Sequence, residues 1–143
     1  MKKRIVYVLI VLLTIMNIYC IYVAKKYKYN YLQSERNIYE QICGGLLEIS
    51  INLDGDNNKI SNELYATIKL TQCFKEKRDI ARLEYILNKF YYKTLDNESL
   101  KKVSSRDEEI KKSLSLIRED LLKDYLIDDY DNINKLDELL DSI

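Results

Sequence analysis

The pattern of hydrophobic and polar positions begins with one unbroken apolar stretch, Ile5 to Ala24. The stretch contains no charged residue. At about 1.5 Å of rise per residue, a helix of this length spans roughly 30 Å, the thickness of the hydrocarbon core of a bilayer. Backbone polar groups cannot stay unpaired in lipid, so a single stretch of this kind has to be helical. It therefore predicts one transmembrane helix.

The end of this stretch lacks the features of a processed leader. A signal peptide has small residues at two positions before its cleavage site, and here Tyr22 and Ala24 occupy those positions. Tyrosine is too large, and Cys20 also lacks the small residues that precede a lipoprotein cysteine. We therefore expect residues 5–24 to be an uncleaved signal anchor that follows a short basic tail, residues 1–4.

One face of the predicted transmembrane helix gathers most of its small and polar residues, namely Thr14, Asn17, Cys20 and Ala24. An asparagine inside a bilayer gains about 0.6–2 kcal/mol by hydrogen bonding to another helix. This predicts a membrane-helix contact face for a second copy or for another membrane protein. Alternatively, Asn17 bonds to its own backbone or to water, and the sequence leaves both interpretations open.

Basic residues flank both ends of the stretch and do not decide its orientation. They are Lys2, Lys3 and Arg4 on one side and Lys25, Lys26, Lys28 and Arg36 on the other. A short tail before the first apolar stretch is typical of a signal anchor, which favours the cell membrane with a cytoplasmic N-terminus and the C-terminal domain outside. Tyr27, Tyr29 and Tyr31 then mark the membrane interface.

In residues 25–143 the apolar positions repeat at intervals of three and four, the period of amphipathic helices. The stripes are Ile38, Ile42, Leu46, Ile49 and Leu53; Leu64, Ile68, Thr71 and Phe74; Ile80, Leu83, Leu87 and Phe90; Val103, Ile110, Leu114, Ile117, Leu121 and Tyr125; and Ile133, Leu136, Leu140 and Ile143. Proline is absent and glycine occurs three times. We expect an all-α fold, a single N-terminal transmembrane helix followed by a small antiparallel helical bundle of four to five helices.

Turn-forming residues divide the first half of this domain. The pair Gly44-Gly45 predicts either a kink or a second helix that packs closely. The segment 54–58, Asp-Gly-Asp-Asn-Asn, should end the first helix. The stripes on either side of 75–79 are out of phase, which predicts a kink or tight turn there with Asp79 as the N-cap of the next helix.

Weaker signals divide the second half. The pair Asp96-Asn97 should end the third helix. The stripe from Leu100 to Tyr125 predicts one amphipathic helix. Alternatively, Ser105 and Glu108 match a capping box from which the helix can start, with 98–103 as a separate turn. The segment 128–132 should be a loop before a short last helix.

The first turn also resembles a calcium-binding loop. In an EF-hand frame the sequence NLDGDNNKISNE places Asn52, Asp54, Asp56, Asn58 and Glu63 at positions one, three, five, seven and twelve. However, Asn57 replaces the glycine at position six and Lys59 the apolar residue at position eight. A plain Asn/Asp turn without metal is the alternative, and calcium is the only cofactor that the sequence suggests.

Cys43 and Cys73 lie equally far from Asn58. A helical hairpin that turns at Asn58 would bring them to one level, where an oxidising exterior would allow a disulfide. The alternative is that both are small core residues, because free cysteine is often buried.

The sequence lacks the residues of most catalytic sites. Histidine is absent, and the three glycines form no phosphate-binding loop, so we expect no enzyme. Residues 1–106 carry 18 basic and 11 acidic side chains and residues 107–143 carry 5 and 12, which disfavours nucleic acid as a partner. We expect a membrane-anchored structural or protein-interaction component of a membrane complex, with a partner in the membrane or envelope or a second copy. The alternative is a membrane-anchored sensor or regulator that binds a ligand such as calcium.

Overall fold

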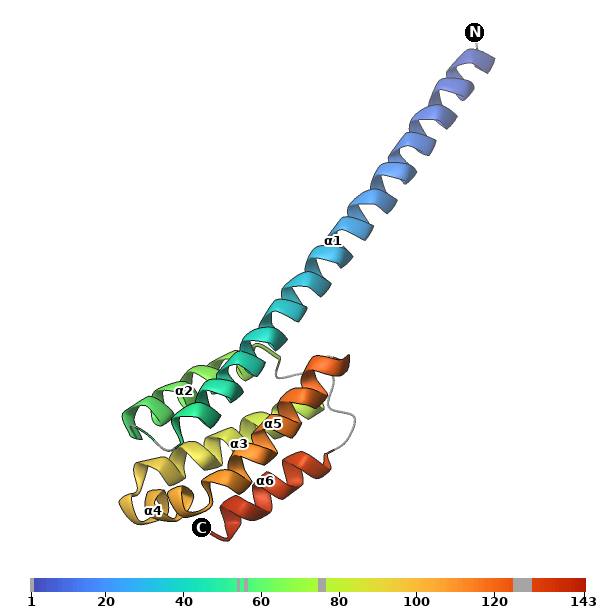
Figure 1. The fold of residues 1–143 in the computed structure, drawn as a ribbon. Coiled ribbons are helices and arrows are strands. Elements are labelled where there is room, and N and C mark those ends of the chain that lie inside the picture. The colour runs from blue at the N-terminus through green and yellow to red at the C-terminus, as the bar shows by residue number, and fades with distance from the viewer. Residues whose placement is uncertain (1, 54, 56, 75–76, 125–129) are drawn as a thin grey trace. The chain divides into compact units, whose positions relative to one another are not determined.

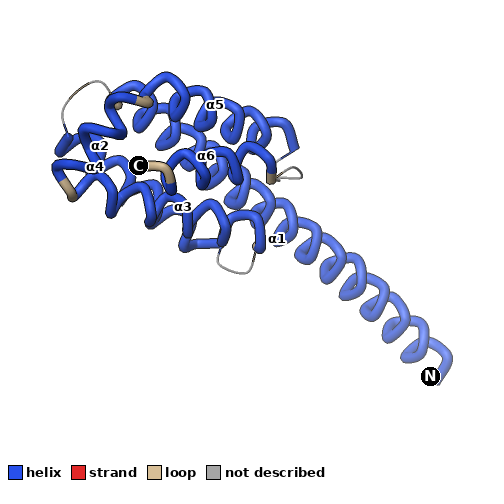
Figure 2. The backbone as a smooth tube through the Cα atoms, turned by 90° about the horizontal axis from the view of Figure 1, so that it is seen from below, coloured by secondary structure: helices blue, strands red, loops and turns tan. Residues whose placement is uncertain are grey.

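The computed structural model describes residues 2–53, 55, 57–74, 77–124 and 130–143. Over these residues the chain forms six α-helices, one short 3₁₀ helix and no strand, which confirms the all-α prediction (Figures 1 and 2). The helices are α1 (Lys2–Asn52), α2 (Asn57–Thr71), the 3₁₀ helix η1 (Gln72–Phe74), α3 (Arg78–Leu95), α4 (Asn97–Ser105), α5 (Asp107–Asp124) and α6 (Asp131–Asp141).

The chain divides into two units, Met1–Arg36 and Asn37–Ile143. In the first unit α1 carries its apolar side chains on all sides without covering them. The large apolar residues between Tyr7 and Tyr22 are 52–71% exposed. Within the described residues, α1 is the one helix long and apolar enough to cross a membrane.

The second unit is organised around one hydrophobic core to which every helix contributes. The core residues are Tyr39, Ile42, Cys43, Leu46, Ile49 and Leu53 from α1 and its end; Ile60, Leu64 and Ile68 from α2; Ile80, Leu83, Ile86, Leu87 and Phe90 from α3; Val103 from α4; Ile110, Leu114, Ile117 and Leu121 from α5; and Ile133, Leu136, Leu140 and Ile143 from α6 and its end. The residues of the predicted apolar stripes that the structure describes are largely these core residues, so burial of one face per helix drives the fold.

The helix α1 runs without a break through Gly44 and Gly45. Of the two expected outcomes, the close approach of a second helix is the correct one, because Thr67 of α2 lies directly against Gly45. The helix then ends at Asn52, and the backbone N–H of Gly55 donates to the Asn52 carbonyl at 2.9 Å. The predicted turn therefore does end α1, while Asp54 and Asp56 lie outside the described residues.

The predicted turn before α3 is present, but its capping residue differs from the expected one. The N–H of Lys77 donates to the Phe74 carbonyl at 2.9 Å, and Lys77 is the N-cap. Asp79 lies inside α3, so the prediction that it caps the helix is wrong. The N-cap therefore lies two residues earlier than predicted, and the Lys77 ammonium there lies 5.2 Å from the ring centre of Tyr39, which stacks on Phe74.

The predicted helix from Leu100 to Tyr125 is two helices in the structure, separated at Arg106. The break falls where the apolar stripe lacks a member, and the N–H of Arg106 closes α4 on the Val103 carbonyl at 3.0 Å. The alternative start near Ser105 is closer to the structure, since α5 begins at Asp107 after a separate helix, but the capping box is wrong because the Ser105 hydroxyl donates to the Lys102 carbonyl at 2.7 Å. Tyr125 lies outside the described residues.

Two further helix boundaries can be compared with the prediction, and one of them agrees with it. Asp96 ends α3 as predicted, and its side chain caps α4 by accepting a hydrogen bond from the Ser99 N–H at 2.9 Å. The expected loop at 128–132 is too long at its end, because Asp131 and Asn132 already belong to α6. Asn132 instead donates to Asp120 of α5 at 3.0 Å.

Candidate interaction surfaces

The face of α1 that was predicted to contact another helix is exposed along its length, at Thr14, Asn17, Cys20 and Ala24. The Thr14 hydroxyl donates to the Ile10 carbonyl at 2.9 Å. The Asn17 amide donates to the Leu13 carbonyl at 2.9 Å, which corresponds to the intrahelical alternative for its N–H group. Pairing of this face with another helix stays a prediction.

The five residues of the predicted calcium loop are only partly described, because Asp54 and Asp56 lie outside the described residues. Asn52 belongs to α1, where its amide donates to the Glu48 carbonyl at 2.8 Å. Asn58 and Glu63 both belong to α2. Position seven of an EF-hand binds through its backbone carbonyl, and a residue inside a helix directs that carbonyl along the helix axis into the helical hydrogen-bond pattern. In the described part of the chain no group of three or more His, Cys, Asp or Glu residues converges on a metal position.

The two candidate disulfide cysteines differ in environment, and all three cysteines are free in the structure. Cys43 is buried and its thiol contacts the Arg118 carbonyl at 3.9 Å. Burial raises the pKa of the Cys43 thiol to about 11, the nearby Arg118 lowers it and Glu40 adds a smaller rise. Cys73 is exposed, and its thiol contacts the Lys69 carbonyl at 3.7 Å. Cys43 is thus a core residue as expected, whereas Cys73 is not.

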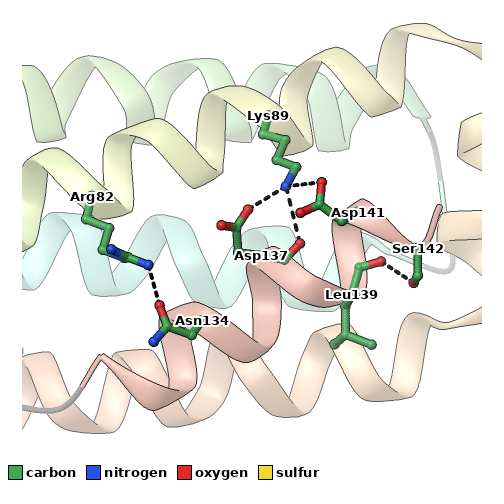
Figure 3. A network of polar contacts seen from close by, with 7 residues as sticks. All are labelled: Arg82, Lys89, Asn134, Asp137, Leu139, Asp141 and Ser142. Carbon is green, nitrogen blue, oxygen red and sulfur yellow. Dashed lines mark hydrogen bonds and ion pairs between the residues drawn. The ribbon is translucent and has the colours of Figure 1, made fainter.

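A polar network joins α3 to α6 (Figure 3). The Lys89 ammonium lies 2.5 Å from a carboxylate oxygen of Asp137 and 2.6 Å from one of Asp141. Burial lowers the pKa of Lys89, but the hydrogen bonds and charges of the two aspartates outweigh burial and raise the pKa above 10.5. Arg82 adds a hydrogen bond to Asn134 at 2.5 Å. The network holds α6 against α3. The Lys89 ammonium uses its N–H groups for the carboxylate and carbonyl of Asp137 and the carboxylate of Asp141.

The outer sides of α2 and α3 carry a cluster of aromatic side chains, which we call the tyrosine surface. It consists of Tyr65, Tyr85, Tyr91, Tyr92 and Leu95. Tyr85 and Tyr92 are 64% and 67% exposed, and seven residues place them on one face of α3. The ring centres of Tyr65 and Tyr91 lie 6.2 Å apart and those of Tyr91 and Tyr92 5.9 Å apart.

A groove of about 500 Å³ runs between α5 and α6. Its lining residues are Arg106, Glu109, Lys112, Ser113, Leu116, Lys135, Glu138, Leu139 and Ser142. Arg106 donates to the Ser142 hydroxyl at 2.7 Å. Among the described residues, the side chains of Glu109, Lys112, Lys135 and Glu138 make no ion pair or hydrogen bond. Lys111 differs, because it pairs with Asp107 at 3.1 Å.

Neither the tyrosine surface nor the groove between α5 and α6 was predicted from the sequence. The tyrosines stand on the polar side of the α3 stripe, where the spacing of Tyr85 and Tyr92 is a detectable signal. The unpaired charges of the groove have no such signal, because pairing depends on where α6 lies against α5.

The chain matches no protein-family model, no curated protein and no solved structure.

Proposed function

We propose that this chain is a single-pass membrane protein whose helical domain is a protein-interaction component of a membrane complex. The observation that carries the proposal is the uncovered apolar segment of α1, in which Tyr7 and Tyr22 bracket side chains that are more than half exposed. An apolar surface of this extent is not stable in water, whereas a bilayer covers it completely. The remaining residues are then an antiparallel helical bundle held at the membrane.

The tyrosine surface is the docking site in this proposal. Tyrosine combines a large apolar ring with a hydroxyl that stays hydrated. Its exposure to water therefore costs little free energy, and burial of its ring in an interface contributes much to binding. The ammonium of Lys69 lies 5.3 Å from the ring centre of Tyr65 and adds a cation at the rim. Tyrosine is enriched among the few residues that contribute most of the binding energy at protein interfaces. The partner is another membrane or envelope protein.

The calcium-sensor alternative receives no support from the residues that the structure describes. Asn58 lies inside α2, where its backbone carbonyl belongs to the helical hydrogen-bond pattern, whereas position seven of an EF-hand offers this carbonyl to the ion. We therefore propose the interaction role alone.

The anchoring and the orientation are tested together in intact cells. The full chain with Cys20→Ala presents one exposed thiol, Cys73, because Cys43 is buried. We expect the protein to stay in the membrane pellet after alkaline carbonate extraction, and Cys73 to react with a membrane-impermeant maleimide. Release into the carbonate supernatant would refute the anchor. A retained protein whose Cys73 reacts only after lysis would keep the anchor and reverse the orientation.

The docking role is tested with a photo-crosslinking amino acid. Placed at Tyr92, it should yield one discrete crosslinked product with a membrane protein that mass spectrometry identifies. The matched control is the same amino acid at Lys101, an exposed position of α4 outside the tyrosine surface. Tyr65→Ala in the Tyr92 derivative should weaken the product, since a central tyrosine contributes about 2 kcal/mol or more to an interface. Equal products at Tyr92 and Lys101 would refute the docking site.

A further inference from the structure

The groove between α5 and α6 is built from two matching helical stripes. On α5 the lining residues are Glu109, Lys112, Ser113 and Leu116, and on α6 they are Lys135, Glu138, Leu139 and Ser142. Both sets follow the spacing i, i+3, i+4, i+7, which defines one face of a helix. Two such faces side by side form one surface against which a second pair of helices can pack.

The register of the two stripes follows from two hydrogen bonds. Arg106 bonds to Ser142 at 2.7 Å near one end of the pair, and Asn132 bonds to Asp120 at 3.0 Å near the other. The two helices therefore run in opposite directions, side by side (Figure 1). Counting inward from either bond places Lys112 and Glu138 at about the same level on opposite walls.

The centre of the groove is small and weakly apolar. Ser113 is 6% exposed, and its hydroxyl makes no hydrogen bond to any residue that the structure describes. Leu116 and Leu139 are half-buried on either side of it. Because the serine between the two leucines is small, the backbone of a neighbouring helix can approach closely there. The charged side chains around it make no ion pair among the described residues.

We propose that the occupant of this groove is the α5–α6 pair of a second copy of the chain, related by a two-fold axis parallel to these helices. Such an axis lays α5 of one copy over α6 of the other at the same level. Lys112 then meets Glu138 of the second copy, and Glu138 meets Lys112 of the second copy. One self-complementary face thus forms two equivalent ion pairs.

Charge and attachment favour a second copy over an unrelated helix. The unpaired side chains comprise two cations, Lys112 and Lys135, and two carboxylates, Glu109 and Glu138, so the face attracts another face like itself. At about 1.5 Å per residue, α6 is only about 16 Å long, which limits the area that the two copies can bury. The contact is therefore weak in solution. Confinement to one bilayer raises the effective concentration, so the inference rests on the proposed anchoring.

The test measures energy transfer between copies of the full chain in phosphatidylcholine vesicles. Donor and acceptor dyes are attached to Cys73 in the Cys20→Ala background, where Cys43 is buried. We expect transfer in the parent protein. Lys112→Glu alone and Glu138→Lys alone should each weaken association about tenfold or more, because each places like charges opposite one another twice.

The decisive sample mixes donor-labelled Lys112→Glu with acceptor-labelled Glu138→Lys. Both cross-copy pairs are then attractive, and transfer should return to within about threefold of the parent association. Pairing inside one chain predicts no such rescue, because each single variant keeps its own like charges. The control Lys101→Glu reverses a charge on an exposed residue of α4 and should leave transfer unchanged.

Three results would overturn the inference: no transfer in the parent, single variants that associate like the parent, or a mixture without rescue. Association that resists both charge reversals would instead come from the helix face around Asn17. Vesicle flotation tests the anchor separately. A chain that floats without energy transfer refutes only this inference, whereas a chain that does not float refutes the proposed function.

Discussion

Gly45 of α1 and Thr67 of α2 lie so close that a Cβ atom at Gly45 would stand 2.1 Å from the Thr67 hydroxyl oxygen. The threonine cannot move away easily. Its Cβ and Cγ2 would lie 3.1 and 3.2 Å from the same point, and its hydroxyl is bonded to the Glu63 carbonyl at 2.7 Å. Glycine is thus required at position 45 by the spacing of two helices.

Gly45→Ala should therefore destabilise the domain. Alanine gains about 1 kcal/mol of helix propensity over glycine, but overpacking costs about 1–3 kcal/mol, so we expect a net loss of roughly 1 kcal/mol. The matched control is Gly44→Ala, where nothing lies within 4 Å and where we expect a gain of about 0.5–1 kcal/mol. Urea unfolding of the full chain in a mild detergent measures both. A stabilising Gly45→Ala would show that the helices are farther apart.

The Lys89 network predicts a loss of stability at alkaline pH. Asp137 and Asp141 raise the pKa of Lys89 in the folded chain despite burial. The ion pairs therefore stabilise the fold fully at a pH below the pKa of Lys89 in the unfolded chain. This stabilisation disappears as the pH rises through the pKa of Lys89 in the folded chain. Lys89→Met should lower the free energy of unfolding by about 1–2 kcal/mol at pH 8. Above pH 10.5 the difference between the parent and this variant should shrink.

The comparison between the parent and Lys89→Met needs a second lysine variant as a control. Lys101→Met removes an exposed cation of α4 and should cost almost nothing at any pH. A difference between the parent and Lys89→Met that stays constant to pH 12 would show that the variant loses packing and not an ion pair.

Asp96 predicts the opposite pH dependence. Its carboxylate accepts hydrogen bonds from Ser99, which lower the pKa of Asp96 in the folded chain. The cap therefore stabilises the fold at a pH above the pKa of Asp96 in the unfolded chain. This stabilisation disappears as the pH falls through the pKa of Asp96 in the folded chain. Asp96→Ala should lower the thermal midpoint at pH 7, and the difference should shrink below pH 3.8. Asp96→Asn keeps a capping oxygen without titrating and should stay close to the parent at pH 7. A pH-independent effect of Asp96→Ala would contradict the cap.

The residues show why the helices were more predictable than their boundaries and surfaces. Apolar periodicity alone identifies the core face, and Ile80, Leu83 and Leu87 are buried as that pattern requires. Local capping rules favoured Asp79, whereas the N-cap of α3 is Lys77, whose ammonium contacts the ring of Tyr39, a residue far away in the sequence. The groove depends in the same way on how α6 lies against α5. Such contacts have no local signature.

The two domain cysteines predict a sharp difference in reactivity. Because burial raises the pKa of Cys43 to about 11, little thiolate exists at pH 8, and the core also excludes reagents. Iodoacetamide should modify Cys73 in the folded protein and Cys43 only in urea, as peptide mass spectrometry will show. If neither thiol reacts in urea until a reductant is added, the two cysteines are paired and the predicted disulfide exists.

Calcium should leave the stability of this chain unchanged. Position seven of an EF-hand binds calcium through its backbone carbonyl, and Asn58 lies inside α2, where that carbonyl is directed along the helix axis. A ligand that prefers the folded state raises the unfolding midpoint, by about 2.7 kcal/mol at a hundredfold excess over its dissociation constant. We expect equal midpoints in EDTA and in millimolar calcium. A rise that Glu63→Gln abolishes would mean that residues 57–63 rearrange around the ion and would restore the sensor interpretation. A rise that Glu63→Gln leaves intact would place the ion elsewhere.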